Sequence, residues 1–174
     1  MVLKVRPMHA VSEIITRLDL VPLTIEGGYF RETYRAPLTI ATNALPADYT
    51  GDRNVSTCIY YLLTPDTFSA IHIVKSDEIF HFYAGDAVEM LELWPHGEAR
   101  IVTIHNDLAA GHEPQHVVPA GVWQGCRLAH GGSWALMGCT VAPGFDYADF
   151  ELGNRDALCG KYPQHSDLIT ALTK

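Results

Sequence analysis

The middle of the chain is a succession of short apolar runs, and this feature most limits what the chain can fold into. From residue 56 to residue 143 the runs are rich in β-branched and aromatic residues and are bounded by Gly, Pro, Asp or Asn. Short strands at regular spacing form a β-sandwich or a barrel, because strands of a parallel sheet would alternate with longer helical segments. The runs are STCIYYLL, TFSAIHIV, DEIFHFYAG, AVEMLELW, ARIVTIHN, QHVVPAG, WQGCRLA and SWALMGCTVAP.

The segments on either side of these runs have other patterns. Apolar residues at helical spacing within residues 8–20 predict an amphipathic helix. Residues 41–54 are polar and rich in turn formers, which predicts a loop. Residues 156–174 predict a short terminal helix. We therefore expect one all-β domain over residues 1–174, with its barrel at about 25–152 and small helices at both ends.

Charge and composition narrow the classes of partner. The formal net charge is −8, from 12 basic and 20 acidic residues, and the basic residues are scattered. This disfavours binding to nucleic acid or to an anionic membrane, since both need clustered positive charge. The sequence has neither an apolar run long enough to span a bilayer nor a secretory signal, so we expect a cytoplasmic protein. Its four cysteines lie far apart, and we expect them to be reduced thiols.

Several polar residues fall inside the apolar runs. Residues 68–85, FSAIHIVKSDEIFHFYAG, place His72, Asp77, Glu78 and His81 in segments that otherwise predict buried strands. Burying an ionised carboxylate costs several kcal/mol unless it is paired or ligated. In residues 87–94 a glutamate falls on each face of the strand, so whichever face is inside carries a carboxylate. A small barrel with polar groups in its lumen usually holds a ligand.

Two motifs identify a family. Glu78–Gly85 follows the spacing Glu, six residues, Gly, and Pro119–Gln124 supplies Pro-x-Gly-x-x-Gln. Together with the segments EGGYFRETYR, SDEIFHFYAG, VVPAGVWQG and GCTVAPGFDYADFEL, they resemble the cupin superfamily and, within it, the mostly uncharacterised DUF985 or cupin_5 family. The resemblance implies a double-stranded β-helix (a jelly-roll barrel), commonly a homodimer, with a small molecule bound in the barrel.

The resemblance also suggests a metal site, although the usual ligand set is incomplete. Ala70 stands where the first histidine of a metal-binding cupin would lie, and Gln124 stands where the histidine of the second motif would lie. His72, Glu78 and Gln124 would then be the metal ligands, with Ni, Zn, Fe or Mn as the candidate ion. His81 is a candidate fourth ligand, but alternation places it opposite Glu78 unless a bulge intervenes.

A metal-free reaction is the other catalytic interpretation. A histidine beside a carboxylate can work as a general base near neutral pH, with His72 as the base and Glu78 as its partner. The segments EGGYFRETY and SAIH are similar to parts of sugar-nucleotide 3,5-epimerases, which use a His base and a Tyr acid. This similarity implies epimerisation or isomerisation of a sugar or sugar nucleotide.

Other residues are candidate ligand contacts. Phe30 and Trp123 could wall a pocket, and Arg31 could bind a phosphate or carboxylate bidentately. Three interpretations stay open: an isomerase or epimerase that uses His72 and Glu78, a non-catalytic ligand-binding cupin, and a metal-dependent cupin enzyme. The ligand-binding candidates are Phe30, Arg31, Tyr61, His81, Trp123 and Gln124.

Overall fold

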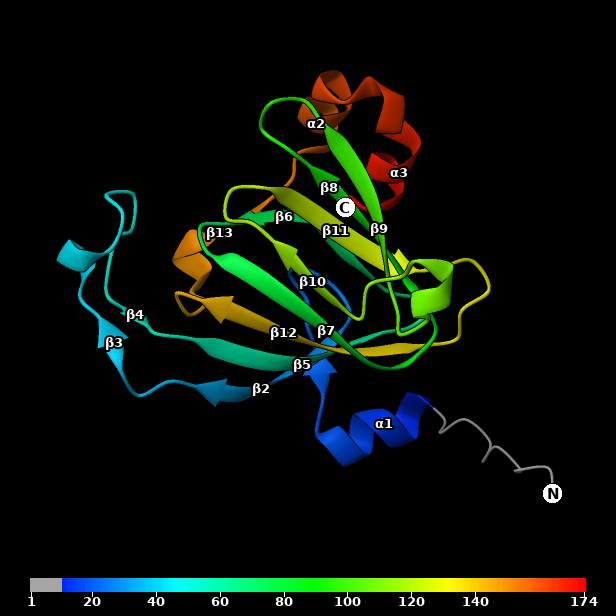
Figure 1. Ribbon diagram of the computed structural model, residues 1–174, viewed down its shortest axis with the longest axis horizontal. Coiled ribbons are helices and arrows are strands. Elements are labelled where there is room, and N and C mark those ends of the chain that lie inside the picture. Colours follow the sequence, from blue (N-terminus) through cyan, green and yellow to red (C-terminus); the bar gives the residue numbers. More distant parts are fainter. Residues whose placement is uncertain (1–10) are drawn as a thin grey trace.

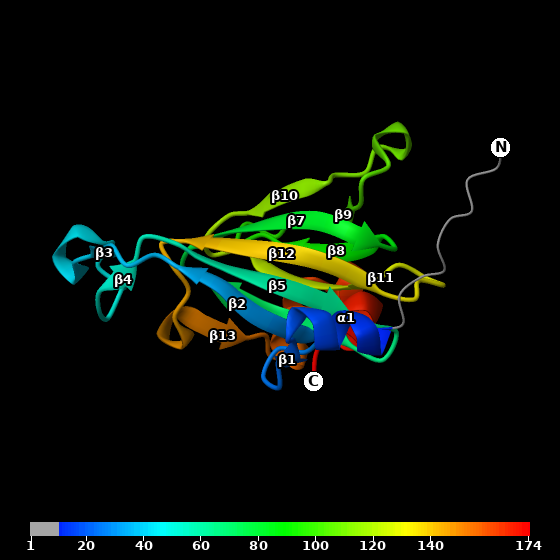
Figure 2. The same cartoon turned by 90° about the horizontal axis from the view of Figure 1, so that it is seen from below.

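The computed structural model describes residues 11–174 and shows two antiparallel sheets packed face to face (Figures 1 and 2). The first sheet has six strands, which in spatial order are β1 (Val21–Pro22), β2 (Tyr29–Arg35), β5 (Thr57–Leu63), β12 (Ala135–Ala142), β7 (Asp77–Gly85) and β10 (Gln115–Val118). The second has five strands, which are β13 (Phe150–Leu152), β6 (Phe68–Val74), β11 (Trp123–Leu128), β8 (Val88–Leu93) and β9 (Ala99–Ile104).

Each apolar run expected to be a strand contains one of these strands, so the all-β prediction is confirmed. The expected loop at 41–54 needs correction, because its last residues form β4 (Arg53–Asn54) and pair with β3 (Thr39–Ile40). Within the described part of the chain, four short 3₁₀ helices lie in the connections: η1 (Thr42–Ala44), η2 (Leu108–Ala110), η3 (Tyr147–Asp149) and η4 (Pro163–His165).

Helices cover the outer faces of both sheets. The predicted N-terminal helix is present as α1 (Val11–Leu18), and residues 8–10 of that prediction lie outside the described residues. Its Ile14 packs with Leu62 and Trp134 on the outer face of the six-stranded sheet. The predicted C-terminal helix is in fact two, α2 (Arg155–Lys161) and α3 (Ser166–Ala171). They cover the outer face of the five-stranded sheet, where Leu91 and Leu93 are buried. Among residues 11–174 we find no helix long and apolar enough to cross a membrane.

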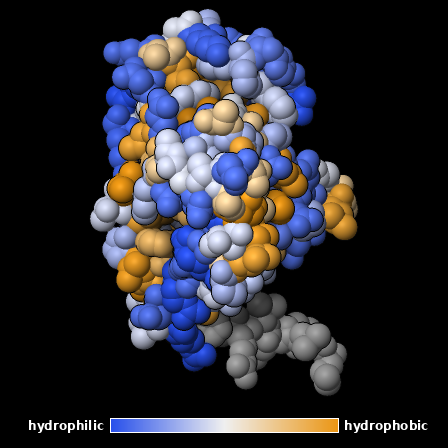
Figure 3. Space-filling model, turned by 90° about the vertical axis from the view of Figure 1, so that its left-hand side faces the viewer, coloured by the Kyte–Doolittle hydropathy of each residue, from blue (hydrophilic) through white to orange (hydrophobic). Residues whose placement is uncertain are grey.

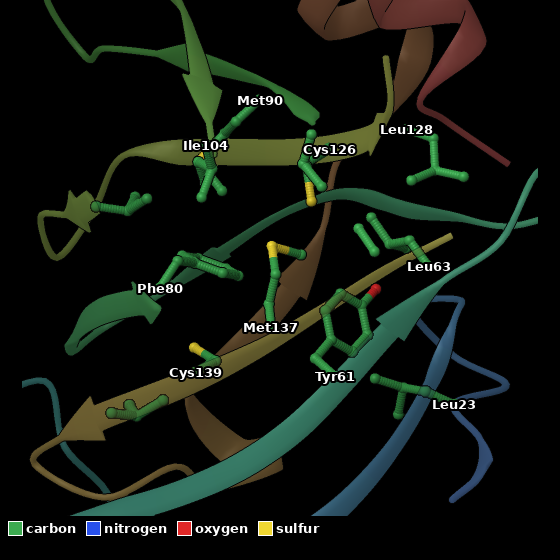
Figure 4. Packing of buried hydrophobic residues seen from close by; sticks show 14 of the residues in the cluster. Leu23, Tyr61, Leu63, Phe80, Met90, Ile104, Cys126, Leu128, Met137 and Cys139 are labelled. Carbon is green, nitrogen blue, oxygen red and sulfur yellow. The ribbon is translucent and has the colours of Figure 1, made fainter. Parts of the chain in front are cut away.

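The main core lies between the sheets. Met137 and Tyr61 of the six-stranded sheet point toward Met90 and Cys126 of the five-stranded sheet (Figure 4). Strand alternation produces this layer, because every second residue of a strand faces the opposite sheet. On the outside, apolar and polar residues are mixed on the side of the molecule from which the β3–β4 arm projects (Figure 3).

Candidate functional site

A cavity of about 330 Å³ lies where β7 begins and β12 ends. Figure 1 shows these strand ends on the side from which the β3–β4 arm projects. The walls of the cavity come from the loop before β2, from β2, β5, β7 and β12, and from the segment that contains η3 and β13. Most of the wall is apolar, which suits the hydrocarbon face of a small ligand. The apolar residues that line it are Leu23, Ile25, Phe30, Ile59, Val141, Phe145, Tyr147 and Phe150.

The charged groups of the cavity wall are mostly acidic. Arg35 is the cation among the lining residues, and its guanidinium already binds Glu32 through two contacts, Nε–Oε1 at 3.0 Å and Nη2–Oε2 at 2.7 Å. It also donates to Asn54 Oδ1 at 2.9 Å. The positive charge at the wall is therefore neutralised by the protein itself. The lining carboxyl groups are those of Glu26, Glu32, Glu78 and Asp146.

Three of the predicted site residues converge beside this cavity. His72 on β6 and Gln124 on β11 lie directly opposite each other on neighbouring strands, and Glu78 comes from the facing sheet. Gln124 Nε2 lies 2.7 Å from His72 Nε2 and donates to Glu78 Oε2 at 3.0 Å. His72 Nε2 is 3.5 Å from Glu78 Oε2. His72 and Gln124 are almost inaccessible and Glu78 is 7% exposed. The three side chains therefore form one buried polar cluster.

Glu78 is the member of this cluster that reaches the cavity. Its carboxylate lines the wall, and its Oε1 lies 3.8 Å from the Cys139 thiol. His72 lies behind it, 1% exposed, with its ring stacked on Phe150 at 5.0 Å between centroids. His72 is absent from the cavity wall, and its role as a base stays a prediction. In this structure the Glu78 carboxylate is at the cavity wall, and the His72 imidazole lies behind it.

The electrostatics agree with that arrangement. Burial opposes protonation of His72, but the negative charges of Glu26 and Glu78, and hydrogen bonds to Glu78 and to the Ala70 carbonyl, raise its pKa to about 9. His72 Nδ1 is 2.7 Å from Ala70 O, which keeps a proton on that nitrogen. At neutral pH the ring is therefore an imidazolium.

The amide of Gln124 must match the protonation of His72. Gln124 Oε1 is buried and has no hydrogen-bond partner among residues 11–174. With His72 protonated on both nitrogens, the amide must turn over so that Oε1 accepts from His72 Nε2. The donation from Gln124 to Glu78 Oε2 is then lost, and His72 Nε2, 3.5 Å from that oxygen, is the group that pairs with the carboxylate. Exchanging the nitrogen and oxygen positions leaves the shape of the amide nearly unchanged. Gln124 can thus accommodate either state of the imidazole.

Glu26 is a site residue that the sequence reasoning missed. It lies in the turn before β2, and its neighbour Gly27 has φ of 123°. A Cβ at Gly27 would collide with the carbonyl oxygen of Phe68, so glycine allows the turn to lie against β6. The Glu26 carbonyl accepts from Ala70 N at 3.0 Å, and its Oε1 accepts from Ser69 Oγ at 2.5 Å. The signal was present in the sequence as a glutamate followed by two glycines.

Burial raises the pKa of Glu26, and the repulsion of Glu78 adds to the effect. The charge of His72 and the hydroxyl groups of Ser69 and Tyr61 act in the opposite direction, and burial outweighs them. The carboxyl group of Glu26 thus holds its proton to a higher pH than an ordinary glutamate. It lines the same cavity as Glu78.

Three predicted ligand contacts lie on outer faces, away from the cavity. Arg31 stacks over the Tyr60 ring at 5.4 Å, on the face of the six-stranded sheet that α1 covers. His81 is on the outer face of β7, where its Nε2 lies 3.1 Å from Thr140 Oγ1, as strand alternation predicts. Trp123 packs with the residues under α2 and α3. None of the three lines the cavity, and their binding roles stay a prediction.

The other candidates point inward. Phe30 lines the cavity wall. Tyr61 is 1% exposed and its hydroxyl donates to Gly27 O at 3.0 Å, so it supports the glycine turn that carries Glu26. The binding roles of these residues stay a prediction.

A second histidine–glutamate pair lies between the sheets, with its histidine, His116, 13% exposed. Glu92 on β8 is directly opposite Gln124, and it is the inward carboxylate that the pattern of residues 87–94 required. Its Oε1 lies 2.6 Å from His116 Nε2, and its Oε2 accepts from Trp94 Nε1 at 3.2 Å. His116 Nδ1 in turn lies 2.6 Å from Glu113 Oε2. Each group of this pair is satisfied by protein neighbours.

The donor set does not fit a resident metal ion. Among residues 11–174 there is no cluster of three or more His, Cys, Asp or Glu side chains placed to hold one. The converging groups supply one imidazole, one carboxylate and one amide, whereas a catalytic zinc site uses three strong protein ligands. His72 Nε2 is also within hydrogen-bond distance of the amide of Gln124. The proposed ligand set His72, Glu78 and Gln124 is therefore better described as a hydrogen-bonded cluster.

Comparison with known proteins places the chain in a family. The model of the family described as Cupin superfamily (DUF985) matches residues 12–153. An uncharacterized protein of Saccharomyces cerevisiae is 33% identical over 151 residues, which cover 82% of this chain and 75% of the yeast protein. A hypothetical protein from Leishmania major has a similar structure, with a TM-score of 0.84 and 31% identity over 95% of this chain and 99% of that one.

Two further structures extend the comparison. A protein of Shewanella oneidensis superposes with a TM-score of 0.84 and 33% identity, covering 96% of this chain and 99% of that chain. A variant of oxalate decarboxylase from Bacillus subtilis has a TM-score of 0.51 and 15% identity, over 88% of this chain and 37% of that one, which shows likeness of fold alone. With its matched motifs and its two packed antiparallel sheets, the chain belongs to the cupin superfamily, in the family described as DUF985.

Proposed function

We propose that this protein is an enzyme that binds a small, uncharged polar metabolite, such as a neutral sugar, and isomerises or epimerises it by proton transfer. The observation that carries the proposal is the position of Glu78. Its carboxylate lines the cavity, while hydrogen bonds and charge hold it from behind through Gln124 and His72. A base next to a carbonyl substrate needs this combination of access and fixed orientation.

The division of roles follows from burial. Glu78 touches the ligand and accepts the proton, and His72 is a positioning residue that acts through Glu78. The His72 imidazolium lies 3.5 Å from Glu78 Oε2 and attracts the carboxylate electrostatically. In a site with little water this electrostatic support is stronger than it would be at the surface.

The charges of the wall favour a neutral ligand. Four carboxyl groups line the cavity, and the guanidinium of Arg35 is already paired with Glu32. The phosphates of a sugar nucleotide would meet repulsion there, because they need a cation that is free to bind them. Carboxylates and hydroxyl groups can hydrogen-bond to a sugar, and Phe30, Phe145 and Phe150 can cover its apolar faces. The cavity volume of about 330 Å³ suits a ligand of monosaccharide size.

The test is hydrogen exchange in deuterated water. The protein is incubated with a panel of neutral aldoses, ketoses and deoxysugars, and incorporation of deuterium next to the carbonyl is followed by NMR. We expect exchange with the wild-type protein and a rate about a thousandfold lower in Glu78→Gln. Glu89→Gln is the matched control, because Glu89 pairs with Arg127 at 2.9 Å away from the cavity.

The result that overturns the proposal is equally direct. If ligands of the panel raise the melting temperature but the wild-type protein exchanges none of their hydrogens, the cavity serves binding only. Exchange that is equal in the wild type and Glu78→Gln would remove Glu78 from the reaction.

A further inference from the structure

We propose that Asp149 is a positioning residue of the cavity: through its ion pair with Arg53 it holds an aromatic wall (Phe145, Tyr147 and Phe150) in the position that binds the ligand. The inference rests on the function proposed above and names a residue that sets the affinity of that site. Asp149 does not itself line the cavity, so it acts through its neighbours in the chain.

The aromatic wall belongs to one short segment, residues 144–152, which crosses from the six-stranded sheet to the five-stranded sheet. Its three rings line the cavity. Each ring contacts the other two, with centroids 5.1 Å apart for Phe145 and Tyr147, 6.1 Å for Phe145 and Phe150, and 6.2 Å for Tyr147 and Phe150. Edge-to-face pairs at such separations attract one another. The three rings therefore form one packed unit, and a contact that fixes the segment fixes all of them.

Asp149 holds the middle of this segment. The two ends are held by the backbone, since Gly144 N donates to Asn54 O at 2.8 Å and β13 pairs with β6. Between them, the Asp149 carboxylate accepts two hydrogen bonds from the Arg53 guanidinium, from Nε to Oδ2 at 2.6 Å and from Nη2 to Oδ1 at 2.7 Å. The two side chains are 1% and 5% exposed. A two-point contact between planar groups fixes direction as well as distance.

Arg53 is a well-anchored partner for that contact. Its Nη1 donates to two backbone carbonyl groups of its own loop, both at 2.9 Å, and its guanidinium lies over the Tyr49 ring at 5.5 Å from the centroid. The Tyr49 hydroxyl donates to Lys75 O at 2.8 Å, in the turn between β6 and β7. The anchor is therefore joined to the strands that carry His72 and Glu78.

The buried ion pair is better suited to fixing a position than to adding stability. Taking two charges out of water costs free energy that their attraction offsets only when the geometry is good, so the net stabilisation is small. Apolar side chains of similar volume could often fill the same space without loss of stability. They would lack the directional contact that a carboxylate and a guanidinium make. Here that contact acts on the segment that forms one side of the cavity.

The effect should fall on ligand binding and leave proton transfer nearly unchanged. Glu78, Gln124 and His72 are positioned by the strands β7, β11 and β6. Their arrangement does not pass through the ion pair of Asp149. Loosening the aromatic wall would therefore weaken the contacts to the apolar face of the ligand while the proton acceptor stays in place.

The experiment has one arm that needs no substrate. Asp149→Asn keeps the shape of the side chain and removes its charge, and Arg53→Lys keeps the charge and removes the two-point contact. Deuterium uptake followed by mass spectrometry should show the backbone amides of residues 144–152 exchanging about tenfold faster in both variants, with β12 unchanged, because local opening then needs less free energy. Uptake equal to that of the wild type in both variants would overturn the proposal.

The second arm measures the kinetics of substrate hydrogen exchange with the panel described above. We expect Asp149→Asn and Arg53→Lys to raise KM about tenfold and to keep kcat within about twofold of the wild type. Glu89→Gln is the matched control with unchanged KM, because it also removes the charge of a carboxylate paired with an arginine. Melting temperatures verify that each variant is folded. A fall in kcat at unchanged KM would contradict a role in binding.

The outcomes separate this inference from the proposed function. If the wild type catalyses exchange and both variants keep its KM, Asp149 does not position the aromatic wall and the proposed function stands. If the wild type catalyses no exchange, the proposed function fails, and the deuterium uptake of residues 144–152 still decides whether Asp149 holds the wall in place.

Discussion

Two histidine–glutamate pairs occupy the interior of the same sandwich, and they have different surroundings. Glu92 accepts from Trp94 and contacts His116, which also contacts Glu113, so every polar group has a protein partner. Glu78 contacts His72 and Gln124 on one side and opens to a cavity on the other. The first pair has the features of a structural ion pair, and the second those of a reactive site.

The comparison shows that residue type and burial do not identify the site. Both glutamates are buried, and both lie beside a histidine from another strand. What separates them is which side of the carboxylate remains open. A buried charge with all its hydrogen bonds made contributes to a unique fold, whereas one with an open side can exchange a proton with a ligand.

The largest effect should separate the two glutamates by activity. We expect Glu78→Gln to lower the rate of hydrogen exchange about a thousandfold, since it removes the proton acceptor. Glu92→Gln should keep a rate close to that of the wild type. Measuring both rates under the same conditions checks this, and an equal loss in the two variants would erase the distinction between the pairs.

The two glutamates should differ in the opposite way in their contribution to the free energy of unfolding, with Glu92 contributing more. Glu92→Ala should lower the free energy of unfolding by about 3 kcal/mol, because it leaves the imidazole of His116 and the indole N–H of Trp94 without their acceptor. Denaturant unfolding monitored by circular dichroism measures the change. A loss below about 1 kcal/mol would mean that water replaces the carboxylate and that this pair is solvated like a surface one.

The pH dependence of stability should report His72. Its pKa of about 9 in the folded protein lies above the ordinary histidine value of 6.5, so its contribution to stability is complete below pH 6.5 and is lost as pH rises towards 9. We expect the free energy of unfolding to fall by about 2 to 3 kcal/mol across that range. The raised pKa of Glu26 acts in the same direction. In His72→Asn the fall should be smaller, and an unchanged slope would contradict the imidazolium.

The smallest effect is expected at the surface. Glu89 and Arg127 form an ion pair at 2.9 Å, with side chains that are 32% and 43% exposed. Replacing Glu89 by Gln should change the free energy of unfolding by less than about 0.5 kcal/mol, since such pairs are solvated and screened. Thermal unfolding at low and high salt tests this. A larger loss would show that exposure alone does not separate a surface pair from the buried ones.

Much of this architecture could be predicted from the amino-acid sequence. The short apolar runs, the turn formers between them and the two cupin motifs predicted the strands, the fold and the family, because strand periodicity and turn preference are local properties. They also predicted that His72, Glu78 and Gln124 are candidate site residues, and that His81 lies on the face opposite Glu78. The N-terminal helix followed from the spacing of a few apolar residues.

Only the tertiary structure decided which of these groups meet the cavity. Parts of each sheet are covered on both faces, by the other sheet and by helices, so alternation could not tell that Trp123 points outward and Glu92 inward. The approach of Glu26 to β6 depends on a glycine turn packing against a strand more than 40 residues away, as its bond to Ser69 shows. Which side of a carboxylate stays open is a property of the packed surfaces around it. The sequence by itself therefore determined the barrel and the polar residues inside it. The packing of the two sheets decided that Glu78 and Glu26 line the cavity that a ligand would occupy.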